Sequence, residues 1–258
     1  MSGNVTRGLC ALAAGTALAA FTLVTAGAAG AAPGAARSPA AAGTGRPAGA
    51  PGSQLWVRLY NGPGNSFDAA SSVAVSPGGS RVFVTGESQG TTSGLDYATV
   101  AYSAVTGARL WAARYNGPGN GNDAASSVAV SPGGSRVFVI GASRGTRSGP
   151  DYATVAYSAA TGARLWVTRY NGPANGDDAA RSVAVSPSGS TVYVTGSSYP
   201  GSATLAYSAA TGAQLWLARH NDMLLAAVAV SPGGSRVYVT GLTGPSHYDY
   251  ATEAYRAG

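Results

Sequence analysis

The sequence predicts an all-β fold built from four copies of one unit, because short motifs recur along it in a fixed order. Tryptophans stand at positions 56, 111 and 166, each 55 residues from the next, and a fourth follows 50 residues later at position 216. The string Val-Ala-Val-Ser-Pro occurs four times, each time followed by a Val-X-Val-(Thr/Ile)-Gly segment. Self-similarity at a fixed period indicates a repeat architecture. The strings begin at Val73, Val128, Val183 and Val228, and the segments end at Gly86, Gly141, Gly196 and Gly241.

Each unit contains four short segments in which apolar and polar residues alternate, the pattern of half-buried strands. In the second unit these segments are 127–131, 136–140, 152–157 and 164–170, and Gly, Pro, Asn and Ser separate them. No stretch shows a helical period. Four antiparallel strands in about 50 residues, repeated, are typical of the blades of a β-propeller. The sequence therefore predicts a β-propeller of four four-stranded antiparallel blades.

The residues also resemble known propeller repeats. The segment Ala156–Trp166 is similar to the Trp-docking motif of quinoprotein (PQQ-like) propellers, A-x-D-x-x-T-G-K-x-x-W, although Ser158 and Ala163 replace its Asp and Lys. The whole unit more closely resembles the bacterial SBBP-type repeat, and Val73–Gly86 is similar to YVTN and WD40-like repeats. The resemblance spans Gln54–Tyr255. It implies the propeller fold, and it implies little about function because such repeats serve many roles.

The phase of the repeat predicts how the ring closes. The repeat region opens with a lone fourth strand, Leu55–Tyr60, and ends with a third strand, Tyr250–Tyr255. Pairing the two completes the last blade and removes an exposed strand edge that would otherwise recruit another chain. The expected blades are about 68–115, 123–170, 178–220, and 226–255 together with 54–60, and a monomer is favoured over a dimer. The alternative is a half-propeller that dimerises into an eight-bladed ring.

The first 53 residues do not read as part of this domain. Residues 9–32 are uncharged and end in small residues of the A-x-A type that signal peptidase reads, so 1–32 is expected to be a signal peptide. A retained membrane anchor is the competing interpretation. Residues 33–53 are Ala, Pro, Gly, Ser and Thr with two arginines, a composition typical of a disordered linker. The only cysteine, Cys10, leaves with the signal peptide, and the protein is expected to be secreted, extracellular or at the cell surface.

The formal charge of +6 does not indicate nucleic-acid binding. All 16 basic residues are arginines, spaced singly, with no run that would follow a phosphate backbone. Charged residues make up 10% of the chain, against about 25% for an average domain. Nucleic acid is therefore not an expected partner.

Residues that recur in every unit are interpreted as scaffold. The four tryptophans are expected to pack between blades. Asp68, Asp123 and Asp178 are expected to cap turns, because their loops lack the ligand spacing and closing glutamate of a calcium site. The two histidines form no zinc-binding pair, and no nucleophile elbow or phosphate loop occurs. We expect no catalytic residue, cofactor or metal; the rival hypothesis is a quinoprotein- or lactonase-type enzyme.

The long connections of a four-stranded meander predict where a ligand binds. Connections from second to third strand and from fourth to first strand share one face, which we call the long-loop face. They are long and variable, as binding loops on a rigid frame usually are, and they shorten in the last two units. A protein or glycan is the expected ligand. The candidate ligand-binding residues lie where the loops shorten: Tyr199, His220, Asp222, His247 and Tyr248.

Overall fold

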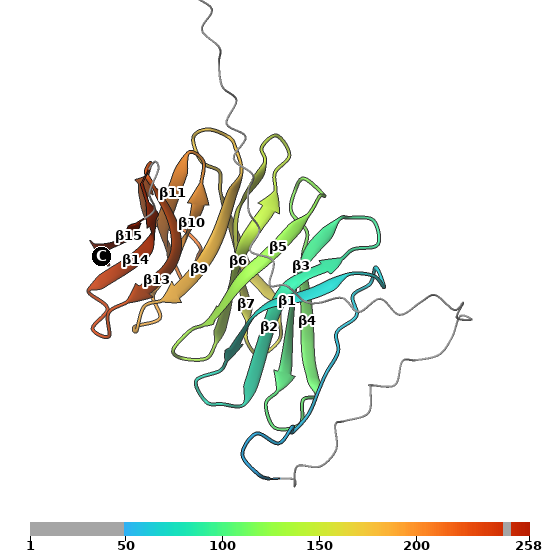
Figure 1. Ribbon diagram of the computed structural model, residues 1–258. Helices are drawn as coiled ribbons and strands as arrows, with labels where there is room; N and C mark the ends of the chain where they lie inside the picture. The colour runs from blue at the N-terminus through green and yellow to red at the C-terminus, as the bar shows by residue number, and fades with distance from the viewer. Residues whose placement is uncertain (1–48, 245–248) are drawn as a thin grey trace, which may run out of the picture. The chain divides into compact units, whose positions relative to one another are not determined.

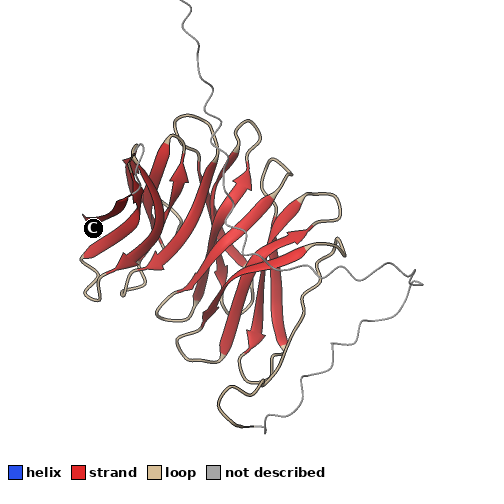
Figure 2. Ribbon diagram, in the orientation of Figure 1, coloured by secondary structure: helices blue, strands red, loops and turns tan. Residues whose placement is uncertain are grey.

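The computed structural model describes residues 49–244 and 249–258. The chain divides into two units, Met1–Ala50 and Pro51–Gly258, and every described strand belongs to the second. Figure 2 shows strands joined by loops, with no helix among the described residues. The predicted all-β class is confirmed.

The strands form four antiparallel sheets, the blades, which follow one another along the chain (Figure 1). In each sheet the strands pair in chain order. The first sheet contains β1 (Asp68–Val75), β2 (Arg81–Gln89), β3 (Leu95–Ser103) and β4 (Arg109–Tyr115). The second contains β5 (Asp123–Val130), β6 (Arg136–Arg144), β7 (Pro150–Ser158) and β8 (Arg164–Tyr170). The third contains β9 (Asp178–Val185), β10 (Thr191–Ser198), β11 (Gly201–Ser208) and β12 (Gln214–His220). The fourth has three strands, β13 (Met223–Val230), β14 (Arg236–Thr243) and β15 (Asp249–Arg256).

A bulge recurs at one place in the first strand of each sheet and explains the glycine that ends each Val-X-Val-(Thr/Ile)-Gly segment. In the second sheet Ala125 pairs with Gly141 and Ser127 with Ile140, which leaves one residue between them unpaired. A Cβ atom on Gly141 would overlap the carbonyl oxygen of Ala124. Such close backbone approach at a bulge is a position that glycine alone tolerates. The equivalent glycines of the other sheets, Gly86, Gly196 and Gly241, stand at the same break in register.

Three apolar cores lie between successive sheets. Strands β1, β5, β9 and β13 contact one another in that order, so the four sheets form a row in which the first strands of successive sheets lie side by side. The face of a sheet that points toward the next sheet is called its forward face, and it supplies large rings such as Phe83 and Tyr97. The opposite face, called the rear face, points toward the preceding sheet and supplies small and branched side chains such as Ala125 and Val137. Burial between sheets is thus the main apolar contribution to stability.

A tryptophan of the fourth strand joins each sheet to the next. Trp111 donates from Nε1 to the carbonyl oxygen of Ala159 at 3.1 Å, and its ring packs 5.8 Å from that of Phe83 and 6.4 Å from that of Tyr157. The ring covers Gly162, whose φ is 73° and where a Cβ would lie 2.7 Å from ring carbons. Trp166 and Trp216 donate in the same way to Ala209 and Ala257. The predicted packing of the tryptophans between blades is confirmed.

The predicted ring closure is not shown. The segment 54–60 is not a strand of any sheet, and β15 pairs with β14 alone among the described strands. The segment lies against the first sheet instead, where Trp56 donates to the carbonyl oxygen of Ala104 at 3.0 Å and Arg58 to that of Gly107 at 2.9 Å. The segment therefore makes the contacts to the next sheet that a fourth strand makes, although it forms no backbone pairing with another strand.

Candidate functional site

The loops from the fourth strand of one sheet to the first strand of the next are built around a buried carboxylate. Asp123 accepts from the backbone N–H of Gly117 at 2.5 Å and from that of Arg144 at 2.8 Å. Burial raises the pKa of the Asp123 carboxyl above its ordinary value, although these hydrogen bonds act in the opposite direction. Asn120 takes a φ of 48°, and its side chain accepts from Asn116 at 2.6 Å. Asp68 and Asp178 accept in the same way from Gly62 and Gly172. The predicted turn-capping role of the three aspartates is confirmed.

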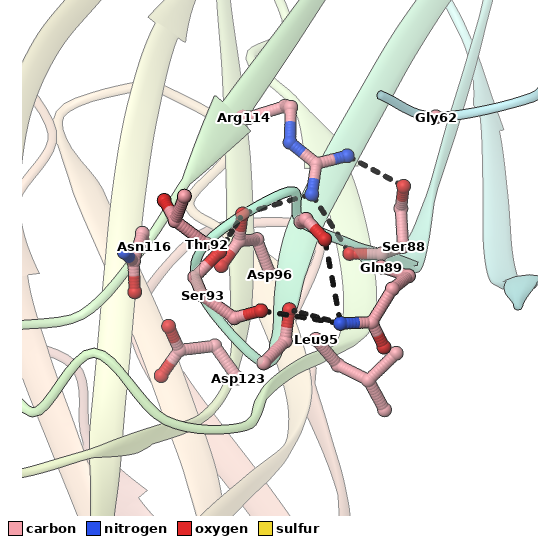
Figure 3. Close-up of polar contacts among 12 residues, drawn as sticks. Gly62, Ser88, Gln89, Thr92, Ser93, Leu95, Asp96, Arg114, Asn116 and Asp123 are labelled. Atoms are coloured by element: carbon pink, nitrogen blue, oxygen red, sulfur yellow. Dashed lines mark hydrogen bonds and ion pairs between the residues drawn. The ribbon is translucent and has the colours of Figure 1, made fainter. Parts of the chain in front are cut away.

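A second polar cluster fixes the loop between β2 and β3 (Figure 3). Arg114 forms an ion pair with Asp96 at 2.8 Å, and the same guanidinium nitrogen donates to the carbonyl oxygen of Ser88 at 2.8 Å. Ser93 donates to Asp96 at 3.0 Å, and the Gln89 amide donates to the Ser93 carbonyl oxygen at 3.1 Å. In the second sheet Arg169, Asp151 and Ser143 repeat the core of this cluster.

These two clusters hold the bases of the loops while leaving their tips in solvent. Thr91 and Thr92 are exposed at the tip of the first loop, and Thr146 and Arg147 at the tip of the second. Ionic hydrogen bonds between partly buried groups are stronger than those in water, so the loop bases are well fixed. The long-loop face is therefore a fixed frame with exposed loop tips.

The structure describes three of the five candidate binding residues, and their side chains lie in different surroundings. Tyr199 lies in the two-residue turn between β10 and β11, 64% exposed and beside Gly176. Asp222 is exposed in the loop between β12 and β13, and its carbonyl oxygen accepts from Thr243 at 2.9 Å. His220 ends β12 and turns inward. His247 and Tyr248 lie outside the described residues.

His220 forms a small polar cluster with two residues that were not nominated from the sequence. Its Nδ1 lies 3.2 Å from a carboxylate oxygen of Glu253, and its Nε2 lies 2.8 Å from the hydroxyl of Tyr255. Tyr255 also donates to the same Glu253 carboxylate. Burial and the neighbouring carboxylate raise the pKa of the Tyr255 hydroxyl, so it stays protonated at neutral pH. Within the described residues the cluster occurs once, between the third and fourth sheets.

The repeat itself carried a signal for this cluster. His220 occupies the position of Tyr115 and Tyr170 at the end of the fourth strand. Glu253 occupies the position of two buried valines, Val100 and Val155. A carboxylate that appears in one unit, at a position that is apolar in the other units, indicates a polar neighbour in that unit. Among the described residues, no group of three or more His, Cys, Asp or Glu side chains is arranged to hold a metal ion.

Comparison with solved structures supports the fold. Hydrazine synthase of Kuenenia stuttgartiensis aligns with a TM-score of 0.52 at 16% identity, over 72% of this chain and 49% of that chain. The chain has the fold of a β-propeller. It spans about half the length of that protein, and at this identity the likeness concerns fold alone.

Two further solved structures align with lower TM-scores. The RRP9 WD40 repeats align at a TM-score of 0.47 and 13% identity over 68% of this chain and 45% of theirs. U3-55K aligns at 0.49 and 12% identity over 72% of this chain and 51% of its own. No protein-family model and no curated protein matches the sequence. The SBBP, PQQ-like and YVTN types therefore stay resemblances.

Proposed function

We propose that the protein is a non-catalytic binding or scaffold module that acts outside the cytoplasm and presents its long-loop face to a protein or glycan. The observation that carries this proposal is the fixed frame of that face. Buried aspartates and Arg–Asp pairs hold the loop bases of the first two sheets, while the tips lie in solvent and the loops shorten after β10 and β12. Variable loops on a rigid frame are where propellers and other repeat folds bind partners.

Among the described residues of the long-loop face, the third sheet contributes a highly exposed aromatic side chain, Tyr199. The loop between β10 and β11 is reduced to two residues, which leaves Tyr199 beside the longer neighbouring loops. Exposed tyrosines supply large contact areas at low cost in conformational entropy, and they are enriched at energetically important interface positions. Tyr199 is therefore the residue on which a binding test depends most.

A binding measurement tests the proposal. We expect the full chain to bind members of one class on an array of glycans and extracellular peptides, with Tyr199→Ala weakening binding at least about tenfold. Val105→Ser is the matched control, because Val105 is 81% exposed in the turn between β3 and β4, on the opposite edge of the first sheet. Equal loss in both variants, or binding that Tyr199→Ala leaves unchanged, would contradict the proposal.

Export gives a second prediction. If residues 1–32 are a signal peptide, the mature chain should begin between about Ala29 and Ala50, because the cleavable small residues and the linker lie there. N-terminal sequencing of exported protein checks this, and an intact chain starting at Met1 in the membrane fraction would contradict it. No helix within residues 49–244 and 249–258 is long and apolar enough to cross a membrane.

A further inference from the structure

The two outer sheets expose the positions that the inner sheets bury. On the rear face of the first sheet Val73 is 64% exposed, whereas its equivalent in the second sheet, Val128, is 7% exposed. On the forward face of the fourth sheet Tyr250 is 93% exposed, whereas its equivalents Tyr97 and Tyr152 are fully buried. Tyr238 and Leu242 are exposed on the same forward face. Each end of the row is thus half of an inter-sheet interface.

The exposed rear face of the first sheet contains an unfilled groove. It has a volume of about 270 Å³, and Trp56, Gly86, Ala98 and Val100 are among its lining residues. In two of the three inner interfaces a tyrosine hydroxyl from the preceding sheet fills the equivalent place, and Ser202 stands at that position in the third. Tyr97 donates to the carbonyl oxygen of Ala153 at 3.5 Å, and Tyr152 donates to that of Ala203 at 3.3 Å.

Ala98 is the first-sheet equivalent of those two alanines, so the groove is a socket for a tyrosine. Tyr250 is the fourth-sheet equivalent of Tyr97 and Tyr152, and it is the exposed member of that set. The knob and the socket are therefore both present in one chain, at opposite ends of the row.

The segment 54–60 is already seated as the fourth strand of a sheet that would precede the first. Trp56 donates to Ala104 at 3.0 Å, as Trp111 donates to Ala159 at 3.1 Å. Arg114 donates to the Tyr60 hydroxyl at 3.4 Å, as the equivalent arginine of the second sheet donates to Tyr115 at 3.0 Å. No backbone hydrogen bond joins 54–60 to any other described residue. Its edge is free for a third strand such as β15.

We propose that the occupant of the groove is the fourth sheet of a second copy of this chain. Tyr250 of each copy fills the groove of the other, and β15 of each copy pairs with the other's segment 54–60. The register of the inner sheets, where Ala101 faces Trp111, then places Ala254 opposite Trp56. Two such contacts, related by a twofold axis, close a ring of eight four-stranded blades. The inference is independent of what the long-loop face binds.

The inner interfaces favour a second copy over closure within one chain. Ring pairs that cross from one sheet to the next have similar geometry: 6.4 Å and 39° for Trp111 and Tyr157, and 6.0 Å and 35° for Trp216 and Tyr255. Trp56 of the segment 54–60 meets Tyr102 of the first sheet in the same way, at 6.2 Å and 35°. With this similar packing from sheet to sheet, both end faces of the row stay exposed in the same chain. Self-closure would require a different step at three close-packed cores, and such cores resist rearrangement. A second copy keeps every step unchanged, in contrast to the monomer that the sequence favoured.

The mass of the full chain in solution tests the proposal. Light scattering and analytical ultracentrifugation should give twice the chain mass. Tyr250→Ser should raise the dimer Kd by at least about 30-fold, as loss of a central interface tyrosine does, whereas Val105→Ser should leave it unchanged. A monomer, or assemblies that grow with concentration as an open head-to-tail series does, would overturn it.

Engineered cysteines decide which chain supplies the strand, even if Tyr250→Ser fails to fold. In a Cys10→Ser background, Arg58→Cys and Thr252→Cys are placed on separate chains, because the proposed register sets these residues opposite each other. Mixing the two variants under oxidising conditions should yield a covalent dimer. A cross-link that forms only within single chains carrying both cysteines would show self-closure and overturn the proposal, as would the absence of any cross-link.

Discussion

Replacing Trp111 by alanine is expected to lower the free energy of unfolding by about 3–5 kcal/mol, the range for large-to-small changes in a core. The side chain is 8% exposed and packs between Phe83 of its own sheet and Tyr157 of the next. The change removes these ring contacts, uncovers Gly162, and leaves the Ala159 carbonyl without its side-chain donor. Chemical denaturation followed by circular dichroism measures the effect.

Two further variants show how much of this loss comes from the buried apolar area of Trp111 and how much from its indole N–H. Trp111→Phe keeps most of the apolar area and removes the indole N–H, so it should recover more than half of the lost free energy. Tyr199→Ala should cost less than about 1 kcal/mol, because the side chain is largely in solvent. A near-neutral Trp111→Ala would mean that the tryptophan does not hold neighbouring blades together.

The all-β class and the blades could be predicted because they depend on local pattern. The segment Arg136–Ile140 was predicted as a half-buried strand, and the structure shows a strand buried on both faces, with Phe138 in one core and Val139 in the other. Recurrence made the scaffold residues separable from the rest, since Trp111 and Asp123 have the same contacts as their equivalents.

Ring closure could not be predicted in the same way. Strand phase shows that Leu55–Tyr60 and Tyr250–Tyr255 are complementary, but it says nothing about the distance between them. That distance depends on the rotation and translation from one sheet to the next, which are set by the packing of rings across the interface, such as Trp111 against Tyr157. The repeat period of a sequence does not show how each sheet is oriented relative to the next. The phase of the repeat therefore does not distinguish a ring closed within one chain from a ring formed by two chains.

The candidate site was predictable in part. Loop lengths indicate the face, and they placed Tyr199 and Asp222 in exposed turns. The inward turn of His220 toward Glu253 was missed, because the two residues are 33 positions apart and pair only when the third and fourth sheets meet. Comparing each unit with the others would have found Glu253, whose equivalents are apolar.

Replacing Gly141 by alanine is expected to lower the free energy of unfolding by about 3 kcal/mol, the upper part of the range for overpacking a core. The added Cβ would overlap the carbonyl oxygen of Ala124 and would lie 2.8 Å from the Tyr97 hydroxyl. The carbonyl belongs to the bulge that pairs β5 with β6, so the clash is with backbone and no rotamer change relieves it. Thermal and chemical unfolding measure the loss.

Gly133→Ala is the matched control for this change, since it adds the same methyl group in the turn between β5 and β6. No heavy atom lies within 4 Å of the Cβ position at Gly133. We therefore expect an effect within about 0.5 kcal/mol, because the new atom meets only solvent. If both variants lost the same free energy of unfolding, the close contact at the bulge would not explain the glycine at position 141. A large loss at Gly141 alone would tie the fourfold glycine to the close approach of β5 and β6.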